Sequence, residues 1–316
     1  MKGSYIDLHT HSCLSDGSLT PEALLRAAVD AGIGILALTD HNATADLVPL
    51  REAFPDLILI QGAEITCRYL DQELHVVALG IDPENAKLRA VLQNNQPDRR
   101  PYLSAILEKL RALGIDVGTY DELQAANPNS RHFGRMQIAK EMQRRGYVAT
   151  ADEAFDVYMG AHGQRLAYVA NPLKYVTLEE AVEAILDAGG IPVLAHLYYY
   201  LLDSEGERAL VRRFKELAGD KAAMEVEYAA YDRAQRDALK ALADEFGLMH
   251  SCASDYHGNL EGETLAHGFD RVLSEPLLEV LGVLRKAAAC AAAFSQSSDQ
   301  FLSMPQANAF STNARW

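Results

Sequence analysis

Six histidines and three carboxylates occupy positions from which their side chains could bind metal ions. His9 and His11 directly follow a short apolar run, and because residues i and i+2 of a strand share one face, both imidazoles can reach one ion. Imidazoles and carboxylates without thiolates suit Mn²⁺, Fe²⁺ or Zn²⁺ and argue against Ca²⁺. The sequence therefore predicts a site for divalent cations. The other candidate ligands lie in or after later runs: Asp16, His41, Glu64, His75, His196, Asp255 and His257.

Apolar runs alternate with helical patterns through residues 5–84, which is typical of βα units around a parallel sheet. Thr20 can cap a helix that has Pro21 at its first position and ends at Gly32. Because α/β barrels carry their sites at the carboxyl ends of the strands, we expect the candidate ligands to meet there. The expected strands of this part are 5–8, 35–38, 57–60, running towards Glu64, and 74–79.

From residue 85 to 177 the pattern changes to polar helices, expected at 102–113, 135–145 and 151–159. The alternation then resumes with helices 178–188, 207–218 and 233–246 and strands 191–195, 223–226 and 248–252. We therefore predict a metal-binding barrel of residues 1–84 and 178–285 and an inserted helical subdomain of residues 85–177 that covers the site. Residues 295–316 are rich in Ser, Gln, Asn and Ala and are expected to be a disordered tail.

Composition places the chain among globular proteins. Its 316 residues are 49% hydrophobic and 23% charged, which suffices for a large core. The net charge of −15 argues against nonspecific attraction to nucleic acid or to anionic membranes. The first residues match neither a signal peptide nor a transit peptide, so we expect a cytoplasmic protein and no membrane partner. The four cysteines lie far apart and are interpreted as reduced thiols.

The candidate ligands lie in seven short motifs: Asp7-Leu8-His9-Thr10-His11-Ser12, Ser15-Asp16-Gly17, Leu38-Thr39-Asp40-His41-Asn42, Gly62-Ala63-Glu64, His75-Val76-Val77, Leu194-Ala195-His196 and Ala253-Ser254-Asp255-Tyr256-His257. Jointly, these motifs resemble the PHP family, named for polymerase and histidinol phosphatase domains, and especially its stand-alone small-molecule and nucleotide phosphoesterases. The resemblance covers roughly residues 1–285. It implies an α/β fold, a distorted (β/α)₇ barrel similar to a TIM barrel, with two or three divalent ions, commonly Mn, Fe or Zn, at its C-terminal rim.

The resemblance also implies a mechanism, in which a hydroxide between two ions attacks phosphorus while the ions hold the nonbridging oxygens. Three divalent ions outweigh three carboxylates, so an acidic protein can still bind phosphate. Asp7 and Asp40 are not implied as ligands, and each could hydrogen-bond an imidazole or cap a loop. The implied ligand sets are His9, His11, Glu64 and Asp255 for one ion, His75 and His196 with Glu64 as the bridge for a second, and Asp16, His41 and His257 for a third.

The segment Ser130-Arg131-His132-Phe133-Gly134-Arg135 resembles the family's Arg-x-His-[Phe/Ile]-Ala-[Arg/Lys] stretch, which faces the metals and meets the substrate phosphate. The resemblance implies Arg131 and Arg135 as substrate contacts and His132 as a general acid for the leaving alkoxide. Ser130 stands where the family usually has Arg. The alternative interpretation is the solvated start of a basic helix.

After His196 the chain reads Leu197-Tyr198-Tyr199-Tyr200, where nucleotide-hydrolysing relatives typically continue Pro-Gly-Arg-Tyr. A basic phosphate contact is therefore missing. The tyrosines, with Tyr198 as the candidate substrate contact, could stack on a base or sugar or could pack the insertion against the barrel.

The leading hypothesis for the activity is hydrolysis of a small phosphorylated metabolite, with a sugar cyclic phosphate of the phosphoribosyl 1,2-cyclic phosphate type opened and then dephosphorylated. The missing Arg favours this substrate over the alternative, a nucleotide 3′-phosphatase or 5′-to-3′ oligonucleotide exonuclease. From other classes, a noncatalytic metal-binding module and an amidohydrolase share the barrel and the metals. A carboxylate bridge at Glu64, in place of a carbamylated lysine, favours phosphorus over an amide carbon.

Overall fold

A mixed sheet of eight strands lies at the centre of an α/β fold. The computed structural model describes residues 5–70, 72–95, 98–126, 134–160, 163–170, 174–258, 265, 269 and 274–282. Neighbouring strands follow the order β1-β2-β3-β4-β6-β7-β8, and β5 pairs with β3. Each predicted strand is present, and β3 runs further than expected. The strands are β1 (Tyr5–Asp7), β2 (Ile33–Leu38), β3 (Ile58–Tyr69), β4 (Gln72–Leu79), β5 (Val176–Thr177), β6 (Ile191–Leu194), β7 (Ala223–Tyr228) and β8 (Met249–Ala253).

The direction of β4 differs from the prediction. Strands β1 to β3 are parallel neighbours, as are β6 to β8, but β4 is antiparallel to both β3 and β6. Strand β3 continues to Tyr69, and only residues 70 and 71 separate it from β4, with Leu70 at a φ of 55°. Parallel neighbours need a crossover of a dozen residues or more, which this turn is too short to provide. The predicted parallel βα repeat is therefore wrong at β4.

The helices begin and end close to the predicted positions. Oγ1 of Thr20 accepts a hydrogen bond from Ala23 N at 3.2 Å, and Pro21 opens α1 (Pro21–Asp30), which confirms the predicted cap. Helix α10 (Arg233–Phe246) has its predicted range. The other helices are α2 (Leu47–Ala53), α3 (Ala86–Asn94), α4 (Arg100–Ala112), α5 (Tyr120–Ala126), α6 (Arg135–Arg144), α7 (Ala151–Glu153), α8 (Leu178–Asp187), α9 (Ser204–Ala218) and α11 (Glu275–Val280).

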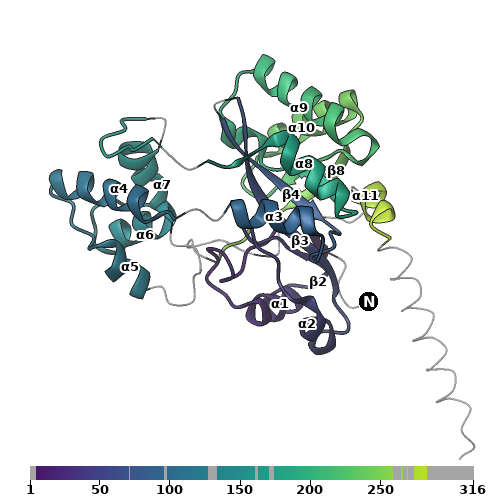
Figure 1. Cartoon of the computed structure of the whole chain (residues 1–316), viewed down its shortest axis with the longest axis horizontal. Coiled ribbons are helices and arrows are strands. Elements are labelled where there is room, and N and C mark those ends of the chain that lie inside the picture. The colour runs from purple at the N-terminus through teal and green to yellow at the C-terminus, as the bar shows by residue number, and fades with distance from the viewer. Residues whose placement is uncertain are drawn as a thin grey trace, which may run out of the picture.

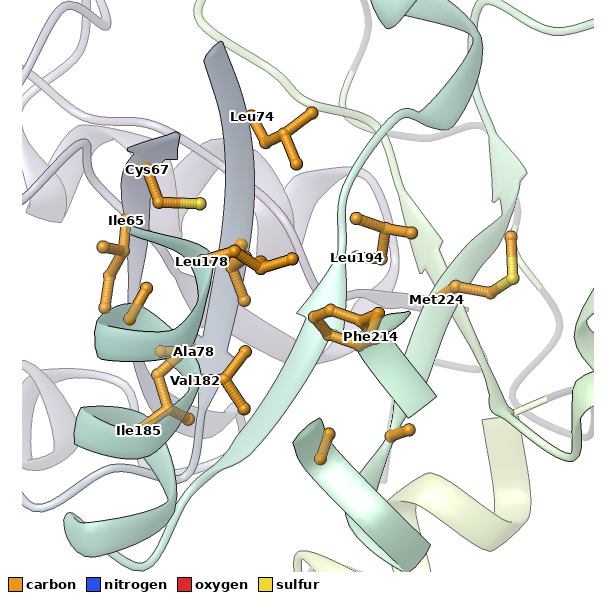
Figure 2. Close-up of a cluster of buried hydrophobic side chains, with 14 of the residues drawn as sticks. Ile65, Cys67, Leu74, Ala78, Leu178, Val182, Ile185, Leu194, Phe214 and Met224 are labelled. Carbon is orange, nitrogen blue, oxygen red and sulfur yellow. The ribbon is translucent and has the colours of Figure 1, made fainter. Parts of the chain in front are cut away.

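Helix α8 packs on the middle of the sheet. Its capping box, formed by Thr177 and Glu180, fixes where the helix begins, and its buried face meets β3 and β4 (Figure 2). Phe214 of α9 and Met224 of β7 extend the same core. Each such side chain contributes about 1.5–3 kcal/mol when fully buried, so this packing holds the strands that carry several candidate ligands. The labelled side chains from α8, β3 and β4 are Leu178, Val182, Ile185, Ile65, Cys67, Leu74 and Ala78.

Helices α4 to α7 form a group beside the sheet, drawn in blue to teal in Figure 1. They bury a hydrophobic cluster of their own that includes Ile106 and Met142. A π-helical segment (Ala154–Met159) continues α7, so the predicted helix over 151–159 contains two helical forms. Helix α3, by contrast, packs on α8, and its Leu88 belongs to the core of the sheet.

Several sequence predictions lie outside the described residues: those on Arg131, His132, Cys290 and the tail at 295–316. Among the described cysteines, Cys67 and Cys252 are buried and form no disulfide. No helix in the described part of the chain has the length and apolar character needed to cross a membrane.

Candidate metal centre

The structure brings all nine predicted ligands together at one end of the sheet. They come from the segments after β1, β2, β6 and β8, from within β3 and from the start of β4. Because β4 is antiparallel, its start lies at the carboxyl ends of the parallel strands, and His75 reaches the cluster from there. The nine residues are His9, His11, Asp16, His41, Glu64, His75, His196, Asp255 and His257.

Glu64 occupies the centre of this cluster and is buried. Its Oε1 atom lies 2.9 Å from Nδ1 of His75 and 3.1 Å from Nε2 of His196. Its Oε2 atom faces the nitrogens of three more imidazoles. A carboxylate that faces imidazoles with both oxygens has the arrangement of a bridging ligand. The three distances from Oε2 are 3.3 Å to His9 Nε2, 3.2 Å to His11 Nε2 and 3.0 Å to His41 Nδ1.

Three overlapping groups of donors lie close enough together to be candidate sites for a metal ion. Within each group the ligand atoms lie within 4.8 Å of one another, and an ion with bonds of about 2.0–2.2 Å separates its ligands by up to about 4.4 Å. The Nε2 atoms of His9 and His11 approach to 2.9 Å, which suits two lone pairs that share a cation. The groups are His9, His11, Glu64 and Asp255; His41, Glu64 and His75; and His11, Asp16, His41 and His257.

The first group is the ligand set that the family resemblance implies for one ion. The second group contains His41 in place of the expected His196, and the third contains His11 in addition to the expected Asp16, His41 and His257. His41 stands between them, since its Nδ1 faces Glu64 and its Nε2 lies 3.9 Å from Oδ2 of Asp16. His11 belongs to the group that contains His257. The donors therefore form one continuous cluster rather than three separate sets.

Two carboxylates that were not expected as ligands hold backbone segments. Asp40 accepts hydrogen bonds from the backbone and hydroxyl groups of both Ser12 and Ser15, at 2.8–3.1 Å. Oδ1 of Asp7 accepts from the backbone N–H groups of His9 and Ser254, and burial raises the pKa of Asp7 to about 7. The sequence left open whether these carboxylates hydrogen-bond an imidazole or cap a loop. In the structure Asp40 caps a loop, and Asp7 likewise accepts hydrogen bonds from backbone N–H groups.

The loop capped by Asp40 carries Asp16 and folds back tightly at Gly17. A Cβ atom on Gly17 would lie 2.5 Å from the carbonyl oxygen of His11 and 2.8 Å from the carbonyl carbon of Ser12. Glycine is therefore required here for close backbone approach, and it lets Asp16 lie 3.2 Å from Nε2 of His257.

Two cluster residues adopt strained backbone conformations. His196 has a φ of 27° and Asp255 a φ of 54°, in a region that residues other than glycine seldom occupy. Such conformations persist where the surrounding structure over-determines them, and they concentrate at functional sites. Here they turn both side chains inwards at the ends of β6 and β8.

Strand β7 supplies two functional residues that the sequence analysis missed. Oε1 of Glu225 lies 2.7 Å from Nδ1 of His9, and its Oε2 accepts from the backbone N–H of His196 at 2.7 Å. Tyr228 donates its hydroxyl to Oδ2 of Asp255 at 2.7 Å. A carboxylate inside an otherwise apolar predicted strand was the available signal for Glu225. Its bond to Nδ1 leaves Nε2 of His9 as the ligand atom.

Carboxylates and imidazoles shift one another's pKa values in the cluster. Burial would raise the pKa of Glu64, but the imidazoles of His41, His75 and His9 hold it well below its usual range. Burial lowers the pKa of His75, but the neighbouring carboxylate of Glu64 outweighs this effect and raises that pKa to about 10. Asp16 likewise overcomes burial and raises the pKa of His257 to about 10. Without a cation the cluster therefore holds protons at neutral pH.

A cavity opens beside the cluster and extends to the helices at α4 and α6. Its lining includes Asp16, His41 and His75 together with Arg99 and Arg135. Arg135, a predicted substrate contact, is therefore placed where it faces the same cavity as the candidate ligands.

Tyr199, rather than the predicted Tyr198, lies next to the ligand cluster. The ring of Tyr199 is 5.5 Å from the ring of His196, with an edge-to-face angle of 84°. The ring of Tyr198 instead lies 5.2 Å from Tyr231, and Tyr198 packs against the hydrophobic core.

The PHP domain matches residues 7–229, and the chain therefore belongs to the PHP family of metal-dependent phosphoesterases. It is 35% identical to the 5′-3′ exoribonuclease Rnm of Escherichia coli K12, over 79% of this chain and 84% of the relative. It is 30% identical to a 3′,5′-nucleoside bisphosphate phosphatase of Chromobacterium violaceum, over 81% and 88%. It is 27% identical to a phosphoribosyl 1,2-cyclic phosphate 1,2-diphosphodiesterase of Eggerthella lenta, over 80% and 94%.

The fold is likewise similar to a solved structure, that of an amidohydrolase from Chromobacterium violaceum with bound sulfate and no metal. The TM-score is 0.77 at 28% identity, covering 88% of this chain and 96% of the other. The curated relatives are hydrolases of phosphoester bonds, and the chain is accordingly a hydrolase of this class. This confirms the family and the reaction class expected from the sequence.

Proposed function

We propose that this chain hydrolyses the 3′-phosphoester of a nucleotide or short oligonucleotide at a centre of two or three divalent ions. The observation that carries the proposal is the position of Glu64, whose two oxygens face five imidazoles at 2.9–3.3 Å. Bound ions would polarise the phosphoryl group and lower the pKa of water, which supplies a nucleophile near neutral pH. Mn²⁺ is the leading candidate, with Fe²⁺ and Zn²⁺ as alternatives, since all three accept these donors.

Each residue of the centre has a role in this proposal. The six imidazoles and three carboxylates described above would hold the ions, with Glu64 shared between two of the donor groups. Arg135 and Arg131 bind the substrate phosphate, and the cavity position of Arg135 supports this. His132 protonates the leaving alkoxide. Both Arg131 and His132 are proposed from the family resemblance of their segment.

The substrate preference rests on two observations that point in different directions. Relatives named for nucleotide and RNA hydrolysis are 30–35% identical to this chain, whereas the relative named for a sugar cyclic phosphate is 27% identical. The nucleotide substrate is therefore proposed first. The turn at Leu197–Tyr200 lacks a basic residue, and this favours the sugar cyclic phosphate as the second candidate.

We also propose that the sheet closes into the distorted (β/α)₇ barrel and that the helices between the two barrel parts form a subdomain over the site. Support for closure comes from hydrogen bonds between the segments after β1 and β8: Asp255 N donates to His9 O at 3.0 Å, and His11 N donates to Tyr256 O at 2.8 Å. The separate hydrophobic cluster of α4 to α7 supports the subdomain. The cytoplasmic location stays a prediction from the sequence.

A substrate panel tests the proposed function. The protein is loaded with Mn²⁺ and offered a nucleoside 3′,5′-bisphosphate, a short 5′-phosphorylated oligonucleotide, a ribose 1,2-cyclic phosphate and histidinol phosphate, and products are read as inorganic phosphate and by mass spectrometry. Release of the 3′-phosphate with higher kcat/KM than the cyclic ester supports the first candidate. His196→Ala and Asp255→Ala should abolish turnover, because each removes a ligand from the cluster.

His250→Ala is the matched control for these variants. His250 lies in β8 and pairs with Asp244 at 2.9 Å, so its loss should leave turnover intact. Wild-type turnover by the Asp255 variant, or release of ammonia from an amide but no phosphate from any ester, would contradict the proposal.

A further inference from the structure

The two tyrosines that flank Tyr199 anchor the turn after β6. The hydroxyl of buried Tyr200 accepts from His75 N at 2.9 Å and donates to Ala195 O at 2.9 Å, which ties the turn to β4 and β6. On the other side, the backbone N–H of Tyr198 donates to the hydroxyl of Tyr231 at 3.1 Å. Tyr200 is thereby tied to the sheet through its hydroxyl, and Tyr198 is held through its backbone N–H.

Backbone geometry fixes the turn further. The 3-10 turn at Leu197–Tyr200 is preceded by His196 at a φ of 27° and followed by Leu201 at a φ of 52°. Residues with a side chain adopt such positive φ values only where the surrounding structure stabilises them. The turn therefore holds Tyr199 in one orientation.

In that orientation Tyr199 presents its ring to solvent beside the ligand cluster. The side chain is 57% exposed, whereas Tyr200 is 5% exposed. Edge-to-face contacts hold the ring at 5.5 Å from His196 and 5.6 Å from Tyr228, and Tyr228 in turn bonds Asp255. An aromatic ring with a free surface thus stands next to two candidate metal ligands on a rigid support.

We propose that Tyr199 is an aromatic platform on which a base of the substrate stacks while the scissile phosphate lies at the metal centre. This inference rests on the phosphoesterase function proposed above. Every nucleobase has a π face, so such a platform accepts any base and adds affinity without sequence specificity. Residues 197–202 contain no Lys or Arg, so this turn offers no cation to a second phosphate, and the exposed ring of Tyr199 is the surface that it presents. A sugar phosphate without a base offers no matching surface.

Two substrates that differ only in the base test the platform. One is a nucleoside 3′,5′-bisphosphate and the other is the corresponding 1-O-methylribose 3,5-bisphosphate, both assayed with the Mn²⁺-loaded full chain. Tyr199→Ala should raise KM for the nucleotide about tenfold, leave kcat nearly unchanged and leave KM for the base-free ester unchanged. Tyr199→Phe and Tyr199→Trp should keep the wild-type KM, because both keep an aromatic ring.

The Phe variant separates the ring from the hydroxyl, which contacts Tyr228. A KM as high for Phe as for Ala would overturn the platform, and so would an equal rise for both substrates in the Ala variant. Tyr147→Ala is the control, because Tyr147 is also exposed but lies after α6, bonded to Asp116. If wild type hydrolyses both substrates with equal KM, the platform fails while the phosphoesterase stands; if it hydrolyses neither, the proposed function fails first.

Discussion

The Nδ1 atom of His9 and the Oε1 atom of Glu225 lie 2.7 Å apart, and both side chains are buried. The second oxygen of Glu225 accepts from the backbone of His196, at the strained end of β6. One carboxylate on β7 therefore orients two cluster residues that lie far apart in the sequence. An imidazole that donates one N–H to a carboxylate presents its other nitrogen to a metal with a fixed tautomer and direction.

Glu225→Gln should weaken metal binding about 10- to 100-fold while the fold is retained. The two oxygens of Glu225 contact His9 and His196 separately, and an amide keeps only one of these two acceptors. The NH₂ group of the substituted side chain would therefore face a donor N–H of either His9 or His196 and form no hydrogen bond with it. Metal content after dialysis and circular dichroism are the measurements. Glu227→Gln is the matched control on the same strand, because Glu227 pairs with Lys240 and Arg236 away from the cluster. Equal metal loss in both variants would show that β7 was merely destabilised.

Metal binding should release protons and strengthen as the pH rises. Glu64 and Asp16 raise the pKa of His75 and His257 to about 10, against the effect of burial, so both imidazoles carry protons at neutral pH when no ion is bound. For each proton that the ion displaces, the affinity for the metal rises up to about tenfold per pH unit. This rise ends above about pH 10, because both imidazoles are then already deprotonated. Calorimetric titration of Mn²⁺ in buffers with different ionisation enthalpies measures the release. Heats independent of the buffer, with constant affinity from about pH 6.5 to 9, would disprove it.

The ligand positions were predictable because each lies at or near the end of an apolar run, and the sheet then brings those ends together. The direction of β4 was not, since the turn after Tyr69 has no Gly, Asn or Pro signal and uses Leu70 at a φ of 55°. The role of Glu225 was also hidden, because its partners come from β1 and β6. Likewise, the tyrosine of the following turn that is exposed depends on the backbone conformations of His196 and Leu201 and on the hydrogen bonds of the turn, which the sequence does not reveal.

His132→Ala should slow esters with poor leaving groups more than aryl esters. A general acid contributes most when the leaving alkoxide is strongly basic, and an aryl oxide leaves without a proton. The ratio of kcat for an alkyl and an aryl phosphate ester, with Mn²⁺ saturating, measures this. A ratio equal to that of wild type would remove His132 as the acid, and His250→Ala provides the reference for an unrelated imidazole.

Gly17→Ala should reduce turnover strongly without unfolding the protein. The added Cβ would meet backbone atoms of His11 and Ser12 at 2.5–2.8 Å, so the loop must move and Asp16 must leave its position near His257. Gly146→Ala is the control, because Gly146 has a φ of 78° but open space around it. Gly146→Ala should lower the free energy of unfolding by about 1 kcal/mol and leave the activity unchanged. Steady-state kinetics and urea unfolding distinguish the two, and full activity of the Gly17 variant would contradict the predicted crowding.

Asn95→Ala should lower the free energy of unfolding by about 3 kcal/mol, because it leaves several buried polar groups unpaired. The Asn95 amide donates to Oδ1 of Asn42 at 3.0 Å and to Thr66 O at 2.6 Å, and its oxygen accepts from Val176 N at 3.1 Å. This one side chain therefore joins β3, β5 and the loop that carries His41. The matched control is Asn94→Ala, one residue earlier and exposed, with an expected change within about 0.5 kcal/mol. Equal urea midpoints for the two variants would mean that the hydrogen bonds of the buried amide add no stability.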